Sequence, residues 1–178
     1  MSEQKKYEFT GKIKTIFGIE FKQIRAIISF GCVVAGEIGG WIECEENLSQ
    51  SGDAWVSGDA RVYGNARVYG NARVSGNARV SGNAWVSGDA RVSGDAEVYG
   101  DAEVKKDDDY MVVGGAGRYN RFTTFFKCRD KTIKVICGCF FGTIIEFRAK
   151  VKETHKGNKH EKVYLAMADM VELQLDDK

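Results

Sequence analysis

The residues best suited to chemistry lie in one glycine-rich, basic segment in the C-terminal half of the chain. Its sequence is GGAGRYNRFTTFFKCRDKTIK, from Gly114 to Lys134. Between Arg118 and Lys134 there are six basic residues and one acidic residue, or +5, in a chain whose net charge is only +1. Guanidinium groups bind phosphate oxygens bidentately, and glycines let a backbone approach a ligand closely. The segment therefore predicts an anion-binding site.

The predicted ligand is a small phosphorylated molecule such as a nucleotide, because aromatic side chains in the same segment can stack on a base. The Gly-Lys-Ser/Thr ending of a P-loop is missing, so the segment does not predict nucleotide hydrolysis. A basic hairpin that only faces solvent is the alternative explanation. The predicted ligand-binding residues are Gly115, Gly117, Arg118, Tyr119, Arg121, Thr123, Thr124, Lys127 and Arg129.

Two cysteines and two histidines further along the chain form a weaker candidate, for a metal. Cys137 and Cys139 form C-x-C, and His155 and His160 form H-x4-H. The histidine spacing lies within the zinc range, but C-x-C is tighter than the usual two to four intervening residues. Core cysteines and surface histidines explain the four residues at least as well, so we expect no metal and no cofactor.

The element that precedes this segment is an array of short repeats. From Ser51 the sequence reads SGDAWV SGDARV YGNARV YGNARV SGNARV SGNAWV SGDARV SGDAEV YGDAEV, which is nine units of six residues. Each unit alternates Ala, a large residue, Val and a polar residue, as expected of a short strand with Ala and Val on one face. Gly followed by Asp or Asn then allows one turn per unit, because these residues tolerate positive φ.

These units resemble the hexapeptide-repeat family, whose pattern is an aliphatic residue followed four positions later by a small one, as in Val62 and Ala66. The resemblance implies a mainly β fold: a three-coil left-handed parallel β-helix, with residues 18 apart stacked on each other. Family members commonly form homotrimers, and Trp55 and Trp85 are large apolar groups that would favour burial between subunits. The expected outward columns are Trp55, Arg73 and Arg91; Arg61, Arg79 and Glu97; and Arg67, Trp85 and Glu103.

The flanks of the repeats differ from them in pattern. Residues 1–50 read as a β-rich N-terminal cap, with short β-prone runs split by Gly11 and Gly18. Residues 51–106 are the β-helix, and residues 107–178 form a small α+β module with strand candidates at MVVGG, TTFFKC and TIKVIC. Thr143 and Glu146 form a capping box that opens a helix to about residue 154, and a second helix spans about 160–173.

The flanking phrases GEIGGWIECEENLSQSGDAWV and TTFFKCRDKTIKVICGCFFGTIIEFRAKVKETH resemble small hexapeptide-repeat proteins encoded by bacteriophages and prophages. This resemblance implies a phage accessory protein without supplying a catalytic residue. We therefore predict a non-enzymatic protein that sequesters a phosphorylated ligand, such as a host nucleotide immune signal. The alternatives are a protein-interaction scaffold and an acyltransferase; the latter is disfavoured because the coils contain no histidine to act as general base.

Charge and hydropathy argue against two further classes of partner, nucleic acids and membranes. The near-neutral charge does not suggest specific nucleic-acid or membrane binding, and no apolar run approaches about 18 residues. Five cysteines without a secretory signal indicate reduced thiols rather than a disulfide framework. We expect a protein of the bacterial cytoplasm.

Overall fold

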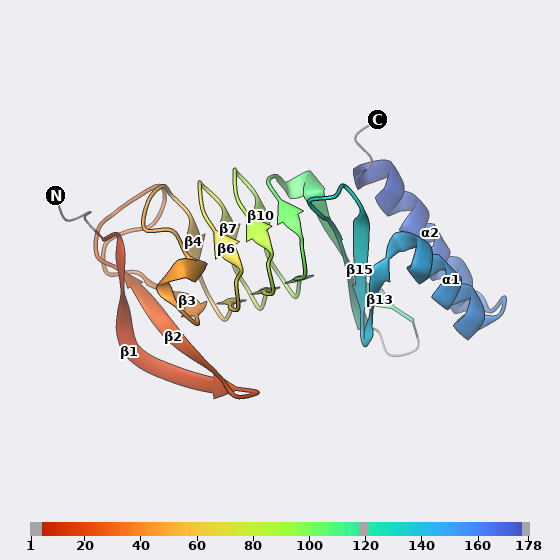
Figure 1. Cartoon of the computed structure of the whole chain (residues 1–178), viewed down its shortest axis with the longest axis horizontal. Coiled ribbons are helices and arrows are strands. Elements are labelled where there is room, and N and C mark those ends of the chain that lie inside the picture. Colours follow the sequence, from red (N-terminus) through yellow and green to blue (C-terminus); the bar gives the residue numbers. More distant parts are fainter. Residues whose placement is uncertain (1–4, 118–120, 176–178) are drawn as a thin grey trace. The chain divides into compact units, whose positions relative to one another are not determined.

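The computed structural model describes residues 5–117 and 121–175, and the chain divides into two compact units (Figure 1). The first contains Met1–Asp101 and Lys105–Asp107; the second contains Ala102–Val104 and Asp108–Lys178. The predicted fold class is confirmed, since a β-solenoid of about four turns is combined with an N-terminal β-hairpin and a C-terminal α+β module. The residues predicted as a separate cap share one unit with the solenoid.

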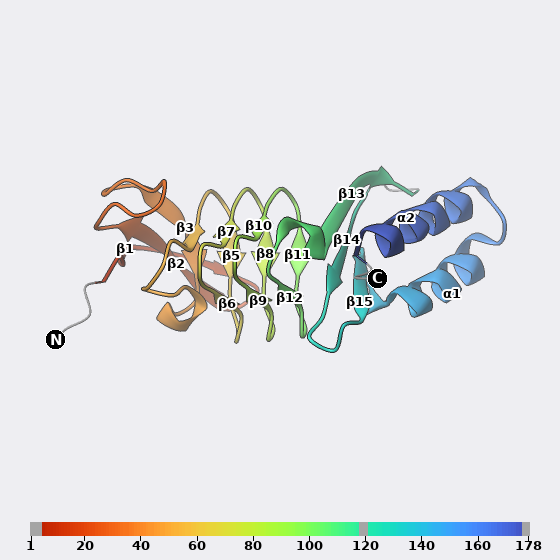
Figure 2. The ribbon, with the colours of Figure 1, turned by 90° about the horizontal axis from the view of Figure 1, so that it is seen from above.

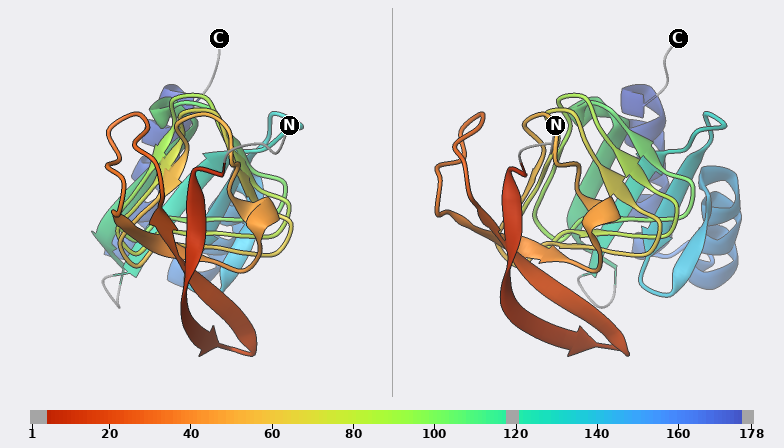
Figure 3. Two further views of the ribbon diagram at one scale, coloured as in Figure 1. Left: turned by 90° about the vertical axis from the view of Figure 1, so that its left-hand side faces the viewer. Right: turned by 60° about the vertical axis from the view of Figure 1, so that its left-hand side comes forward.

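The chain begins with an antiparallel hairpin of β1 (Tyr7–Ile16) and β2 (Ile19–Ala26), visible in Figure 3. Its predicted break at Gly18 is confirmed, but the break at Gly11 is not, because β1 continues through that residue with a bulge between Phe9 and Ile13. Gly11, at φ +86°, absorbs the irregularity in a conformation that glycine adopts freely. β3 (Ile38–Ile42) pairs with β2 and then with the first solenoid strand on that face.

The solenoid is built from two-residue strands, one in each hexapeptide unit (Figure 2). Each strand ends in the valine of its unit, and every alanine and valine of the units is at most 1% exposed. The alternation read from the sequence therefore places the small residues in the core. The strands are β4 (Trp55–Val56), β5 (Arg61–Val62), β6 (Arg67–Val68), β7 (Arg73–Val74), β8 (Arg79–Val80), β9 (Trp85–Val86), β10 (Arg91–Val92), β11 (Glu97–Val98) and β12 (Glu103–Val104).

The solenoid starts one coil earlier than the repeats suggest. Ile42 pairs with Val62 and Leu48 bridges to Val68, a spacing of 20 residues instead of 18. Both side chains are fully buried and take the valine position of the coil that precedes the first repeat. The 3-10 helix η1 (Glu45–Asn47) lies between them and replaces a strand in this coil.

The open end of the solenoid is closed by Lys6. In the coils, backbone N–H groups donate to carbonyls one coil further on, as Trp55 does to Ala72 at 2.9 Å, so carbonyls of the first coil need donors from elsewhere. The Lys6 ammonium supplies them: Nζ donates to the carbonyl oxygens of Ala54 at 2.7 Å and Gly52 at 3.1 Å. Lys6 is only 2% exposed, and its burial lowers its pKa to about 8, although the Asp53 carboxylate opposes the shift.

Asn47 closes a second face in the same way. Its side-chain amide, fully buried, donates to the carbonyls of Gly64 at 3.0 Å and Ala66 at 2.9 Å. The backbone N–H of Asn47 is used inside η1, where it donates to Cys44, so the side chain takes over the inter-coil bond. The cap thus uses two side chains where a further coil would use its backbone.

The outward columns follow the predicted 18-residue register. Trp55 pairs with Arg73, and in a second column Arg61 pairs with Arg79. The Arg79 guanidinium also donates to the Glu97 carboxylate at 2.7 Å, an exposed ion pair along the same column. These outward residues are therefore stacked from coil to coil as predicted.

Trp55 does not lie on an open surface. It is 3% exposed, because its indole packs edge-on against Phe30 at 5.5 Å and Tyr7 at 6.4 Å between ring centroids. The argument that Trp55 becomes buried between subunits therefore no longer holds. The homotrimer stays a prediction that depends on Trp85.

Asn and Asp at the corners have a role that the repeat pattern did not reveal. Positive φ occurs at the corner glycines and at none of the nine Asn and Asp residues that follow them, all of which are described. Instead their side chains form ladders between coils: Asn77 donates to Asp95 at 3.0 Å, and Asn71 donates to Asp89 at 3.0 Å. The columns read Asp-Asn-Asp, Asp-Asn-Asp and Asn-Asn-Asp, so no two carboxylates are neighbours.

We expect Asn77→Asp to destabilise the solenoid by about 1–2 kcal/mol, because it places a third carboxylate between Asp59 and Asp95 and removes the donor of a hydrogen bond. Asn77→Ala is the matched control, since it removes the same bond without adding charge. Urea unfolding at low and high salt measures both variants. The Asp variant should be the less stable at low salt and approach the Ala variant at high salt. Equal stability at low salt would refute the charge explanation.

The second unit contains a four-stranded antiparallel sheet of β13 (Tyr110–Ala116), β14 (Arg121–Lys127), β15 (Ile133–Cys137) and β16 (Phe140–Thr143), in that order. The strands predicted at TTFFKC and TIKVIC are confirmed as β14 and β15, which pair with each other in a hairpin. The 3-10 helix η2 (Asp107–Asp109) comes just before β13.

Two helices follow the sheet: α1 (Ile144–His155) and α2 (Lys159–Leu175). Both were predicted within two residues at each end. The capping box is present, since the Glu146 N–H donates to the Thr143 hydroxyl at 3.2 Å and the Glu146 carboxylate accepts from the Thr143 N–H at 2.7 Å. The core between helices and sheet contains Phe125, Val135, Phe147, Val151, Ala168 and Val171. Among the described residues, no helix is long and apolar enough to cross a membrane.

Candidate functional site

A cavity of about 470 Å³ lies inside the second unit, between the sheet and the turn that joins the helices. The start of β14 and the turn after β15 form one wall. The second half of α1, the α1–α2 turn and the start of α2 form the other. Its lining residues are Arg121, Cys137, Gly138, Cys139, Phe140, Phe147, Lys150, Val151, Thr154, His155, Asn158, His160 and Tyr164.

The charged groups of this cavity are all of one sign. Arg121 and Lys150 are basic side chains, and the imidazole rings of His155 and His160 line the same cavity. No aspartate or glutamate is among its lining residues. The Lys150 ammonium donates to the Glu153 carboxylate at 2.9 Å, an exposed pair that side-chain motion easily opens. The cavity is therefore suited to an anion.

The two histidines are held in place by aromatic contacts. The His155 ring stacks on the Tyr164 ring, with centroids 5.4 Å apart and planes 30° from parallel, and it lies 5.8 Å from His160. Burial, with Cys137 nearby, raises the pKa of Tyr164 to about 12, while Arg121 opposes the shift. Tyr164 thus keeps its proton at neutral pH and presents a neutral hydroxyl.

Local backbone features add to the positive character of the cavity. A Cβ on Gly138 would lie 2.6 Å from a terminal nitrogen of Arg121, so the guanidinium packs directly against this glycine. The Asn158 side chain accepts from the N–H of His160 at 2.8 Å and caps the start of α2. The N-terminal end of this helix, where the dipole is positive, therefore borders the cavity.

Only part of the predicted ligand-binding segment reaches this cavity. Arg121 lines it, and Gly117 approaches it, since a Cβ there would lie 1.9 Å from the Tyr164 hydroxyl. Gly115 lies within strand β13 rather than in a loop. Arg118 and Tyr119 lie outside the described residues.

The remaining predicted residues are not gathered with Arg121. Thr123 and Thr124 are buried, with at most 2% exposed, and the Thr123 hydroxyl donates to the Cys137 sulfur at 3.2 Å. Lys127 lies at the opposite end of β14 and forms an ion pair with Asp109 at 3.3 Å. Arg129 is exposed in the turn before β15. These four residues are not part of the site that we propose.

Several cavity residues were not anticipated as ligand-binding. Lys150 and Thr154 are four residues apart on the predicted first helix, and this spacing alone indicated a shared face. Tyr164 and Gly138 carried no such signal. The four residues of the metal hypothesis, Cys137, Cys139, His155 and His160, all line the cavity. Yet no group of three metal-binding side chains suited to an ion occurs in the described ranges.

The comparisons with known proteins support the repeat architecture. A family described as the YdcK beta solenoid repeat matches residues 54–70, 60–73 and 72–88. Together with the geometry, these matches define the chain as a β-solenoid repeat protein. No curated protein is significantly similar to it. The matched residues lie wholly in the solenoid, so they carry no information on the C-terminal cavity.

Proposed function

We propose that the chain is a non-enzymatic binding protein whose second unit takes up a small phosphorylated ligand in the cavity described above. The observation that carries the proposal is the meeting of Arg121, Lys150, His155 and His160 in one cavity without an aspartate or glutamate in its lining. Arginine and lysine bind phosphate oxygens through charge-assisted hydrogen bonds. The residues come from three elements, so the sheet and both helices jointly position them.

A nucleotide suits the cavity better than free phosphate. The volume of about 470 Å³ lies within the range of small-molecule sites. Phe140, Phe147 and Tyr164 supply an aromatic wall next to the cations. A base could pack on this wall while the phosphate meets the guanidinium and ammonium groups.

Calorimetry with cyclic AMP, cyclic GMP, AMP, ATP and inorganic phosphate tests the proposal. At least one nucleotide should bind, and Arg121→Gln or Lys150→Gln should weaken its binding by about tenfold or more. Arg129→Gln is the matched control, because it removes the same charge from the exposed turn before β15 and should leave affinity nearly unchanged. Absence of binding across the panel, or equal losses in all three variants, would overturn the proposal.

The two histidines give a second test of the proposal. The double variant His155→Gln, His160→Gln keeps polar side chains at both positions but removes the imidazole rings from the lining of the cavity. With a cyclic nucleotide as the probe, we expect this variant to bind several-fold more weakly than the wild type. Unchanged affinity would show that the histidines take no part in binding.

In its finer form, the proposal makes the chain a phage accessory protein that withdraws a nucleotide immune signal from its bacterial host. Its support is the resemblance of both flanking segments to phage-encoded hexapeptide-repeat proteins. Sequestration requires tight binding without turnover, so the bound nucleotide should be recovered unchanged after long incubation. Conversion of the nucleotide into a product would contradict this form and indicate an enzyme.

A further inference from the structure

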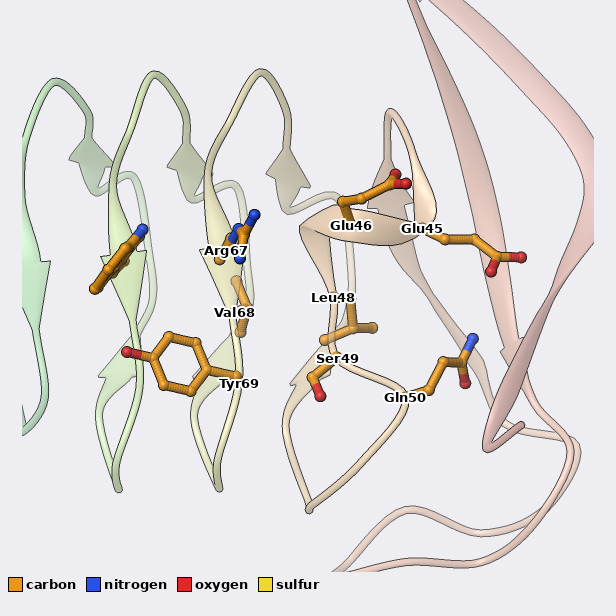
Figure 4. A pocket seen from close by; sticks show the side chains of 9 residues that line it. Glu45, Glu46, Leu48, Ser49, Gln50, Arg67, Val68 and Tyr69 are labelled. Carbon is orange, nitrogen blue, oxygen red and sulfur yellow. The ribbon is translucent and has the colours of Figure 1, made fainter. Parts of the chain in front are cut away.

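The first unit carries a second pocket, of about 500 Å³, on one flank of the solenoid (Figure 4). One side is formed by η1 and the segment that follows it. The other side is formed by the solenoid strands β6 and β9 and the residues next to them. The lining residues are Glu45, Glu46, Leu48, Ser49, Gln50, Arg67, Val68, Tyr69 and Trp85.

The pocket exists because one outward column stops short. Arg67 and Trp85 stack in this column, and the 20-residue offset of the first coil puts Asn47 next in line. Asn47 does not project outward, because its amide is buried on the carbonyls of Gly64 and Ala66. Because no side chain projects outward next to Arg67, a hollow remains there, and η1 forms its opposite side.

The floor and one wall of the pocket are apolar and aromatic. Leu48 and Val68 are buried beneath it. The Tyr69 and Trp85 rings meet edge to face, with centroids 6.4 Å apart and planes at 79°. Tyr69 is 36% exposed, so this aromatic pair is accessible from the pocket. The rings are nearly perpendicular, so the face of one ring can pack on the apolar face of a ligand while the other ring borders it.

The polar groups of the pocket favour a neutral ligand. The Glu45 carboxylate forms an exposed ion pair with the Lys5 ammonium at 2.7 Å, and Glu46 and Arg67 carry opposite charges, so the charges around the pocket sum to zero. Hydrogen bonds from its own backbone and from Cys44 lower the pKa of Glu46, so it is an ionised acceptor at neutral pH. Arg67 disfavours a cationic ligand, and Glu46 disfavours an anionic one. A ligand with several hydroxyl groups satisfies both at once.

We propose that this pocket binds a neutral saccharide. A sugar ring has an apolar C–H face, which would pack on Trp85 and Tyr69, and hydroxyl edges, which would donate to Glu46 and accept from Arg67. The volume matches a ligand of one or two rings. This site lies in a different unit from the phosphate cavity and shares no residue with it.

The test is titration of the full chain with maltotetraose, cellotetraose and N-acetylglucosamine oligomers, followed by tryptophan fluorescence and calorimetry. At least one neutral saccharide should bind, and Trp85→Ala should weaken its binding by about tenfold or more. Trp41→Phe is the matched control, since Trp41 lies under Lys14 at 3.9 Å on another face. It should leave affinity unchanged.

Further variants separate recognition from folding. Arg67→Ala and Glu46→Gln alter exposed side chains, so each should weaken saccharide binding several-fold without lowering the melting temperature. These two variants test the pocket if Trp85→Ala does not fold. No binding by any neutral saccharide would overturn the proposal, as would binding that survives all three substitutions. Preference for choline or for a sialylated oligosaccharide would also overturn it. Because neither pocket shares a residue with the other, nucleotide binding can fail or succeed independently.

Discussion

Replacing Lys6 by methionine is expected to lower the free energy of unfolding by about 2–6 kcal/mol at about pH 10, where the cost of burying a charged ammonium no longer offsets the loss. Methionine fills a similar volume but cannot donate to the carbonyls of Ala54 and Gly52, which the Lys6 ammonium reaches at 2.7 and 3.1 Å. A buried carbonyl without a donor costs about 1–3 kcal/mol, and two are affected here. Urea unfolding of wild type and variant measures the loss.

Lys5→Met is the matched control for this substitution. Lys5 is the preceding residue and is exposed, and its ion pair with Glu45 is a surface pair. Its removal should change stability by less than about 1 kcal/mol. Equal effects of the two substitutions would show that Lys6 acts as an ordinary surface lysine and does not close the solenoid.

The same lysine predicts a pH dependence of stability. In the folded chain its pKa is lowered from 10.5 to about 8, so between these values the unfolded chain binds more protons than the folded one. Stability therefore rises as the pH increases from about 8 towards 10.5. Below about pH 8 the folded chain bears the full cost of burying the charged Lys6 ammonium. Lys6→Met should lack this rise. A parallel pH profile for wild type and variant would contradict the burial of a charged lysine.

Gly76→Ala is the second substitution with a large expected effect. Gly76 lies at a corner with φ +67°, and a Cβ there would be 3.0 Å from the backbone nitrogen of Gly94 in the next coil. The positive φ alone costs about 1–2 kcal/mol for alanine. The close approach adds about 1–3 kcal/mol, because a rigid backbone must move. We expect a total loss of about 2–5 kcal/mol, measured by thermal and urea unfolding.

Gly94 supplies the control, since it ends the same corner column. Its φ is also +67°, but a Cβ there would meet nothing within 4 Å. Gly94→Ala should therefore show the conformational cost alone, about 1–2 kcal/mol. The difference between the two variants isolates the cost of close stacking. If both lose the same stability, the coils are less tightly spaced than the structure has them.

The solenoid was predictable because the repeat period, the alternation within each unit and the turn residues all indicate the same structure. The six-residue period fixes the valines and alanines in the core and the glycines at the corners, and each feature is visible within a single unit. The two C-terminal helices were predictable for a similar reason, since the capping box at Thr143 and Glu146 is a local signal.

The cap and the pockets were not predictable, because they depend on contacts between distant residues. From the sequence, Lys6 would be expected on the surface, because its partner Ala54 is 48 residues away along the chain. Thr123 and Thr124 read as ligand hydroxyls, yet β14 is a central strand of its sheet and both are buried. Only part of the cavity could be predicted. Arg121 was identified from local charge, whereas Lys150 and Tyr164 line the same cavity only because the helices pack on the sheet.

Amide chemical-shift mapping with a cyclic nucleotide tests the phosphate cavity most directly, because it reports where the ligand binds. The account predicts that the largest shift changes occur at Arg121, at Gly138 and Cys139, and in the turn from His155 to His160. The corner residues of the solenoid should remain unchanged. No perturbation at millimolar nucleotide, or changes that spare this cavity, would contradict the account.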